Sequence, residues 1–470
     1  MSASRREFVM AAGAVGLASA TRNATAATGD QLTPEMFGAK GDGRTNDTDA
    51  FAALSDRVNA RGGGTIVLRP VTYIVGKQSR GGPGQKAFVP AGILHLTGCR
   101  GPVVIRGNGA IIRCAAGLRY GGFDRATGRP LPDSRENLRP ENRAEPYWSM
   151  IQVEGCSGSV EISDIELDGN LAGLVVGGKY DRAGWQAGGS GIRMIRNTGP
   201  ERLSQIRSHH HAQDGIIFQS DINRTSSTTV SDSACDENGR CGGSVLAGAN
   251  YNFQRCRFRR TGRAGVPSSP AAGVDIEPEG VPINNVNFTD CEFSDNRGFG
   301  LVAGSAKAQN ATFTGCKFIG TTNYAAWPHG AGFRFSDCLF VGQIVNVFGK
   351  EDPARATQFV NCTFTDDPTL SPTRQVFLGR SGPGTVAVLL KSPNVLFSHC
   401  HFRLVANGLL PQSKSDVIYA DCDMSQRSVE PSAPLGTYIG TNTIRGNARL
   451  EGSVIRGNVT LNGRTVPRNA

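Results

Sequence analysis

A three-residue pattern, Cys-x-Phe, recurs along the chain and strongly limits the folds that this sequence can adopt. Six copies begin, at spacings of 35, 25, 22, 24 and 38 residues, at Cys256, Cys291, Cys316, Cys338, Cys362 and Cys400. Cys422-Asp423-Met424 continues the pattern 22 residues later. In a strand, Cys and Phe share one face and the residue between them takes the other. A strand that returns at this period, with insertions between copies, is typical of a β-solenoid.

A second row of strands is predicted from quartets that open with glycine. They begin at Gly191, Gly215, Gly243, Gly273 and Gly300. The second and fourth residues of each quartet are expected to point inward and the third outward. The third residues should therefore line one outer sheet, in which neighbouring coils lie about 4.8 Å apart. These residues are Arg193, Ile217, Val245, Asp275 and Val302. The residue after each quartet also faces outward, which adds Gln219 and Glu277 to this surface.

The first residues carry the pattern of an export signal. Arg5-Arg6 precedes an uncharged run from Ala11 to Thr21, and Ala24-Thr25-Ala26 offers an A-x-A cleavage site. This arrangement resembles a twin-arginine signal peptide. We expect residues 1–26 to be removed and residues 27–470 to reach the periplasm or the medium as one solenoid domain.

The twelve cysteines are expected to be thiols. Stacked copies of one position are typical of an internal ladder of small apolar side chains. A twin-arginine substrate folds before export, in a reducing compartment. Cys235 and Cys241 are the more plausible pair for oxidation. No C-x-x-C or H-x-x-x-H spacing occurs, so neither a metal nor another cofactor is predicted, apart from a divalent cation such as calcium if the protein is a lyase.

Composition narrows the classes of partner. The 470 residues are 39% hydrophobic and 7% aromatic and include 61 Gly, which favours many tight turns around a sizeable core. The net charge is +10, and the basic residues are 9 Lys and 41 Arg. Arginine matches carboxylates with two hydrogen bonds, which suggests an acidic partner, although a GC-rich genome favours arginine equally. No nucleic-acid module and no membrane span is found, and we expect a monomer.

Residues 33–76 carry the motif that links the chain to a known family. The segments are F-G-A-K-G-D-G-x-T-x-D-T, starting at Phe37, and G-G-G-T-I-V-L-x-P-x-x-Y, starting at Gly62. They resemble the N-terminal cap of the pectate-lyase-like right-handed β-helix superfamily, which includes polygalacturonases, rhamnogalacturonases, lyases, epimerases and phage tailspikes. The resemblance implies an all-β, single-stranded right-handed parallel β-helix with a short capping helix. We expect the helix from Thr48 to Asn59 and strands at 65–68 and 72–75.

Two insertions and a polar turn offer binding residues. Residues 115–150 and 171–190 interrupt the coils, and loops on a rigid scaffold commonly carry function. Candidate substrate contacts in the second insertion are Lys179, Tyr180, Arg182 and Trp185. His209 and His210 lie on a turn, where they act as a base, contact a uronate or are simply exposed. The predicted groove follows Arg193, Gln219 and Asp275 and is walled by residues 171–190.

Asp275 and Glu277 are the leading catalytic candidates. They are two residues apart on one strand, so both carboxylates leave the same face with Cα atoms about 6.5–7 Å apart. That spacing suits an inverting glycosidase, with Glu277 as acid and Asp275 as base. Asp214 is the third candidate because Gln213-Asp214-Gly215-Ile216 resembles the N-T-D-G-I segment of polygalacturonases. The expected D-D and G-H-G segments are replaced by Cys241-Gly242-Gly243 and Ala271-Ala272-Gly273.

Three functions remain open. The first is hydrolysis of a glycosidic bond, in a uronate-containing polysaccharide, by the Asp275–Glu277 pair. The second is a polysaccharide lyase or epimerase, in which Lys, Arg, His or Tyr abstracts a proton from a uronate. The third is a non-catalytic carbohydrate-binding surface protein.

Overall fold

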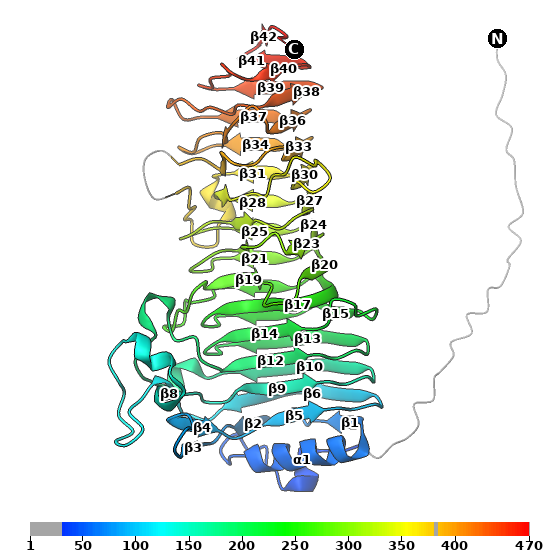
Figure 1. Ribbon diagram of the computed structural model, residues 1–470, viewed down its shortest axis with the longest axis vertical. Coiled ribbons are helices and arrows are strands. Elements are labelled where there is room, and N and C mark those ends of the chain that lie inside the picture. The colour runs from blue at the N-terminus through cyan, green and yellow to red at the C-terminus, as the bar shows by residue number, and fades with distance from the viewer. Residues whose placement is uncertain (1–30, 380–383, 470) are drawn as a thin grey trace, which may run out of the picture.

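The computed structural model describes residues 31–379 and 384–469, which form a parallel β-solenoid (Figure 1). Coils stack from the N-terminal end, blue in the figure, to the red C-terminal end. The predicted parallel β-helix with a capping helix is confirmed. Within the described ranges, no helix is long and apolar enough to cross a bilayer. The predicted signal peptide, residues 1–26, lies outside the described residues.

The N-terminal end of the solenoid is closed by the segment that carries the family motif. A short 3-10 helix, Pro34–Phe37, precedes α1 (Thr48–Arg61), and α1 ends at Gly62 in the left-handed conformation (φ 69°). The Asp47 carboxylate accepts hydrogen bonds from the backbone N–H groups of Lys40 (2.7 Å) and Gly41 (3.1 Å), which fixes the loop before α1. The apolar face of α1 is fully buried, so the helix shields the first coil from water.

Three rows of strands run along the solenoid, and some long strands span two rows. The first row contains β1 (Gly64–Val67), the starts of β6 (Val103–Cys114), β10 (Val160–Asp168) and β13 (Glu201–His209), β15 (Thr228–Ser231), the end of β17 (Cys241–Gln254), β20 (Ile283–Thr289), β23 (Ala308–Gln309), β24 (Thr312–Thr314), β27 (Arg334–Ser336), β30 (Gln358–Val360), β33 (Leu396–Ser398), β36 (Ile418–Ala420), β38 (Thr437–Ile439) and β40 (Val454–Ile455). The second row contains β2 (Thr72–Val75), the ends of β6, β10 and β13, β16 (Ala234–Asp236), β18 (Arg257–Arg259), β21 (Glu292–Ser294), β25 (Lys317–Ile319), β28 (Leu339–Val341), β31 (Thr363–Thr365), β34 (His401–Leu404), β37 (Asp423–Gln426), β39 (Thr441–Arg445) and β41 (Asn458–Leu461), followed by the antiparallel β42 (Arg464–Val466). The third row contains β5 (Leu94–Thr97), β9 (Ser149–Glu154), β12 (Ser190–Ile195), β14 (Asp214–Gln219), the start of β17, β19 (Ala272–Ile276), β22 (Leu301–Ala303), β26 (Ala326–Pro328), β29 (Ile344–Val345), β32 (Ala387–Leu389) and β35 (Gln412–Ser413).

The Cys-x-Phe pattern builds the core of the second row. Phe318 and Phe340 stack with ring centroids 4.8 Å apart, and the neighbouring pairs along the row repeat this geometry. Each thiol of the row contacts a backbone carbonyl of the first row, as Cys338 Sγ does with Phe313 O at 3.4 Å. The prediction of buried thiols is confirmed, because all twelve cysteines are buried and free. Cys235 and Cys241, the pair considered for oxidation, are among these free thiols, and burial raises the pKa of both.

One strand of the third row has a different register from the predicted one. Ile217 pairs with Ser244, so the quartet of this coil opens at Gly242 rather than Gly243. Ser244 therefore joins the outer row, and Val245, predicted to face outward, is buried in the core (1% exposed). The reason is close backbone packing: a Cβ at Gly242 would lie 2.6 Å from the carbonyl oxygen of Gly273. Because Gly242 and Gly243 are adjacent, the sequence alone does not show which of them opens the quartet.

The two predicted insertions pack beside the N-terminal part of the solenoid. With the segment after β2 they form a small five-stranded sheet, seen at the lower left of Figure 1. Its strands are β3 (Gln78–Arg80), β4 (Phe88–Pro90), β7 (Arg119–Gly122), β8 (Arg143–Ala144) and β11 (Val175–Val176). The 3-10 segments of this region are Arg135–Leu138, Pro140–Asn142, Leu171–Gly173 and Asp181–Ala183, and a further one, Pro368–Leu370, lies in the C-terminal half.

Candidate active site

The Asp275–Glu277 pair lies at a cavity beside the third row. Asp275 is the outward residue of β19, and Glu277 follows the end of that strand. Both line an open cavity of about 500 Å³, with Ala183 and Gln186 of the second insertion forming one wall. The backbone N–H of Ser269 donates to Ala183 O (3.0 Å), which holds this insertion against the loop before β19. The structure thus brings the pair and the insertion together.

Arg240 joins the three acidic candidates. Its Nη2 lies 2.9 Å from Glu277 Oε2 and 3.8 Å from Asp275 Oδ2, and its Nη1 lies 3.2 Å from Asp214 Oδ2. The sequence-based prediction missed this residue. A signal was present, since Arg240 directly precedes Cys241, which is the β-partner of Asp214. Its guanidinium is largely buried, and the surrounding acids raise the pKa of Arg240, although burial alone would lower it.

Asp275 and Glu277 differ strongly in burial. The side chain is only 6% exposed, against 51% for Glu277. Burial raises the pKa of Asp275, the charges of Glu277 and Asp214 raise it further, and Arg240 opposes them. The protonated form of Asp275 is therefore favoured. The roles expected from the sequence, Glu277 as acid and Asp275 as base, stay a prediction.

Asp214 lies beneath the cavity and does not line it. Its side chain is fully buried and accepts hydrogen bonds at Oδ2 from Ser244 Oγ (2.9 Å) and from Arg240. Its Oδ1 is buried without a partner. In this arrangement Asp214 anchors Arg240 and does not reach a ligand in the cavity.

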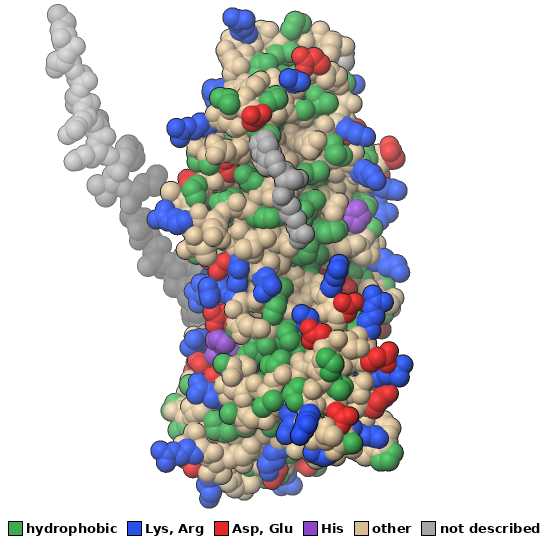
Figure 2. All heavy atoms as spheres, turned by 90° about the vertical axis from the view of Figure 1, so that its left-hand side faces the viewer, with side chains coloured by type: hydrophobic (Ala, Val, Ile, Leu, Met, Phe, Trp, Pro, Cys, Tyr) green, Lys and Arg blue, Asp and Glu red, His purple; other side chains and the backbone are tan. Residues whose placement is uncertain are grey.

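A second cavity of about 300 Å³ adjoins the first and shares Ser269 and Pro270 with it. Lys179, Arg182, Trp185 and Arg297 contribute to its lining. Figure 2 shows this side of the molecule, where basic and acidic side chains gather in a band across the middle. Trp185 is half-buried, and its Nε1 donates to Gly177 O (2.8 Å), so the loop fixes the indole. Lys179 Nζ lies 3.3 Å from Asp133 Oδ2.

The remaining predicted contacts lie elsewhere. Tyr180 is outside the lining of both cavities; its backbone N–H donates to Gly184 O and closes the insertion. Arg193 and Gln219 also lie outside both linings. The Arg193 guanidinium packs over the ring of Trp148 at 4.7 Å, and burial lowers the pKa of Arg193.

The two predicted histidines face a different cavity. His209 and His210 lie at the turn between the second and third rows and border a space of about 190 Å³. Among the described residues, no hydrogen bond or ion pair connects them with Asp275 or Glu277. The next residue, His211, is fully buried; burial lowers its pKa to about 3, and Tyr147 Oη lies 2.8 Å from its Nδ1.

Comparison with known proteins bears on the fold. Residues 149–342 match the family model described as "Right handed beta helix region". Over 44 residues the chain is 57% identical to the capsule KN3-specific Depolymerase 1 of Klebsiella phage KN3-1, a stretch that is 9% of this chain and 6% of that protein. The A-module of the mannuronan C-5 epimerase AlgE4 from Azotobacter vinelandii is 14% identical, with 94% of this chain and 100% of that chain covered, at a TM-score of 0.47. The tailspike gp49 of Acinetobacter baumannii bacteriophage Fri1, a capsular polysaccharide depolymerase, is 12% identical, with coverages of 91% and 65% and a TM-score of 0.43. The family model and the stacked parallel coils agree on the fold, which is a right-handed parallel β-helix.

Proposed function

We propose that this protein is a polysaccharide-active enzyme that cleaves glycosidic bonds with Asp275 as proton donor. The observation that carries the proposal is a buried acid at an open cavity. Asp275 lies against Glu277 and Arg240 on a wall of that cavity, and burial keeps its proton in place near neutral pH. A general acid must be protonated at the working pH, and burial beside a second carboxylate is a known way to achieve this.

In this proposal each member of the cluster has a role. Asp275 donates its proton to the glycosidic oxygen, and Arg240, 3.8 Å away, stabilises the carboxylate that remains. Glu277 is half-exposed and follows the end of β19, so its side chain is free to turn from Arg240 toward the cavity. There it accepts a proton from the attacking water across the sugar ring. Asp214 keeps Arg240 in place from below.

The second cavity supports an acidic polysaccharide as the substrate. Lys179, Arg182 and Arg297 line it directly beside the cavity of the acid pair. Guanidinium groups bind carboxylates with two charge-assisted hydrogen bonds, so uronate units suit this surface. The 44-residue likeness to a capsule depolymerase also points to polysaccharides. The same cations favour a second candidate, elimination at a uronate, because they neutralise the carboxylate next to the abstracted proton.

One experiment separates these functions. The mature protein is incubated with a panel of uronic-acid and neutral polysaccharides, and both reducing ends and the ultraviolet absorbance of unsaturated uronates are followed. Hydrolysis gives reducing ends without that absorbance, and elimination gives both. We expect Asp275→Asn and Glu277→Gln each to lower turnover at least about a hundredfold. The matched control is Glu279→Gln, an exposed acid two residues farther on that does not line the cavity.

Near-native turnover of both variants, with loss of activity on substitution of Lys179 or Arg182, would replace hydrolysis by elimination. Binding without any product would leave a carbohydrate-binding surface protein.

We also propose export by the twin-arginine route. It is supported by Arg5-Arg6 ahead of the uncharged run. Replacing both arginines with lysine is expected to abolish the periplasmic protein on fractionation. An unchanged periplasmic yield contradicts this proposal.

A further inference from the structure

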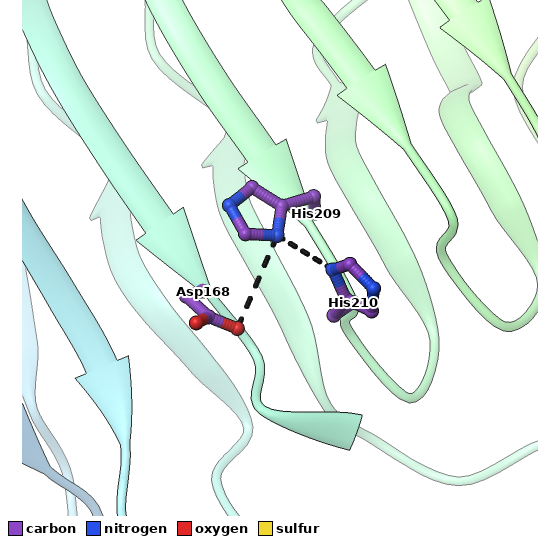
Figure 3. A group of neighbouring side chains, drawn as sticks. All are labelled: Asp168, His209 and His210. Carbon is purple, nitrogen blue, oxygen red and sulfur yellow. Dashed lines mark hydrogen bonds and ion pairs between the residues drawn. The ribbon is translucent and has the colours of Figure 1, made fainter. Parts of the chain in front are cut away.

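Two adjacent histidines and an aspartate meet at the turn that follows the second row. Asp168 ends β10 and His209 ends β13, and the two residues are partners in neighbouring coils. His210 follows in the left-handed conformation (φ 55°), which brings its ring beside that of His209. Figure 3 shows one ring nitrogen of His209 between a ring nitrogen of His210 and the Asp168 carboxylate.

Each ring has one nitrogen that is held by a carboxylate. His209 Nε2 lies 3.2 Å from Glu166 Oε1, and His210 Nε2 lies 2.6 Å from Glu237 Oε2. A neutral imidazole that donates from Nε2 has a lone pair on Nδ1. The two Nδ1 atoms are only 2.7 Å apart, and Asp168 Oδ1 lies 3.9 Å from the Nδ1 of His209. With both protons on Nε2, three electron-pair donors lie close together, and a cation between them would remove their repulsion. Asp168 Oδ1 also accepts a hydrogen bond from the backbone N–H of Asn170 (2.8 Å).

We propose that Asp168, His209 and His210 bind one divalent transition-metal ion of the zinc type. A tetrahedral ion with bonds of about 2.0–2.1 Å spaces its ligand atoms about 3.3 Å apart. The measured separations of 2.7 and 3.9 Å lie on either side of that value, and all three ligand atoms are within 4.8 Å of one another. The site thus needs only small side-chain adjustments.

The groups around Asp168, His209 and His210 are of the kind that orient and support metal ligands. Carboxylates that hydrogen bond the second nitrogen of a ligating histidine orient the ring and make it a better ligand; Glu166 and Glu237 are placed to do this. Arg113 Nε donates to Asp168 Oδ2 (2.7 Å), which directs Oδ1 toward the histidines. The cavity of about 190 Å³ beside the rings leaves the fourth position open to water.

This inference is independent of the proposed function. The ligands come from two consecutive coils, so the ion would connect the coil of β10 with that of β13. The sequence-based expectation of no metal used linear spacing, in which Asp168 lies 41 residues before His209. Because the coils stack, Asp168 and His209 lie next to each other in the fold.

The test uses the folded mature protein after removal of metals with a chelator. Zn²⁺ is titrated in a calorimeter, and Co²⁺ serves as a spectroscopic probe. We expect one ion per chain, and Co²⁺ is expected to give the visible bands of nitrogen and oxygen ligands. His209→Ala, His210→Ala and Asp168→Asn should each remove this binding. Glu166→Gln and Glu237→Gln, which leave all three ligands intact, should weaken it about 10–100-fold.

His399→Ala is the matched control. His399 occupies the same left-handed conformation (φ 55°) at another turn, beside Ser398 and Asp421. This variant should bind Zn²⁺ as the unaltered protein does, and circular dichroism verifies that every variant is folded. Three results would overturn the proposal: no Zn²⁺ uptake, a thiolate-to-cobalt charge-transfer band, which points to the cysteines, or unchanged binding by the His209 and His210 variants. With no uptake, a proton shared between the two rings would explain their contact.

Discussion

The coils before and after residue 300 share one fold but differ in what their outer surfaces carry. In the earlier coils the third row has strands of six residues, such as β12 and β14, flanked by the insertions. In the later coils this row shrinks to two residues in β29 and β35. Charged side chains pair from coil to coil up to Arg263, whereas residues 301–379 and 384–469 contain two ion pairs, His399–Asp421 and Arg445–Asp423. The later coils instead have the most regular aromatic stacks.

The later coils therefore contribute mainly to stability, and the earlier coils carry the candidate functional residues. The interior rows of Cys and Phe stabilise the later coils by burial, and the described residues of these coils form only two ion pairs. The earlier coils place charges in partly buried positions around Asp275 and around His209. Substitutions in the two regions should therefore have different kinds of effect, which the following predictions test.

The largest effect is expected in the aromatic stack. Phe335 is fully buried and stacks on Phe313 at 4.6 Å. Phe335→Ala should lower the free energy of unfolding by about 3–5 kcal/mol, because it removes a large buried side chain and leaves a cavity. Urea denaturation measures this. Phe299→Ala, at a half-exposed ring outside this stack, should lower the free energy of unfolding clearly less. Equal losses would show that the stack has no special role.

The second effect concerns Arg240 and Asp214. Arg240→Gln leaves the fully buried Asp214 carboxylate without its cation and should cost about 3 kcal/mol of unfolding free energy. Adding Asp214→Asn should recover part of that loss, because the uncompensated charge is gone. A double variant that is less stable than Arg240→Gln alone would contradict the coupling.

The third effect is a pH dependence of stability. Because the pKa of Asp275 is raised above its usual value of 3.8 by burial, the folded protein binds a proton that the unfolded chain releases. The contribution of this proton to the free energy of unfolding is fully present below pH 3.8. It is lost as the pH rises toward the pKa of Asp275 in the folded protein, by up to about 1.4 kcal/mol per pH unit. Asp275→Asn should remove this slope. Thermal denaturation across the pH range measures it, and an unchanged slope in the variant would rule out Asp275 as its source.

The smallest effect is expected at an exposed ion pair. Arg255 contacts both carboxylate oxygens of Asp232, at 2.6 and 2.8 Å, but the two side chains are 55% and 46% exposed. Arg255→Ala should change the free energy of unfolding by less than about 1 kcal/mol, and high salt should reduce the difference. A larger loss would show that surface ion pairs between coils also stabilise the earlier coils.

The features that were predictable from the sequence depend on local periodicity. Alternation along a strand placed Asp275 and Glu277 on one face, and the repeated Cys-x-Phe pattern gave the buried row. The raised pKa of Asp275 was not predictable, because it comes from burial, and the cavity that Asp275 lines is walled by an insertion some 90 residues away in the chain. Arg240 and Asp168 were missed for a related reason. Their partners lie one or more coils away, and variable coil lengths obscure which residues become neighbours.

The stacked coils have a consequence for how this chain can change in length. Cys316 and Cys338 are 22 residues apart and occupy equivalent positions in adjacent coils. A deletion of residues 316–337 would bring Cys338 into the place of Cys316, with the Phe row still in register, and a duplication would do the reverse. Each event moves the C-terminal end by about 4.8 Å along the axis. Evolution can thus adjust the reach of the molecule in whole-coil steps while the cavity at Asp275 stays as it is.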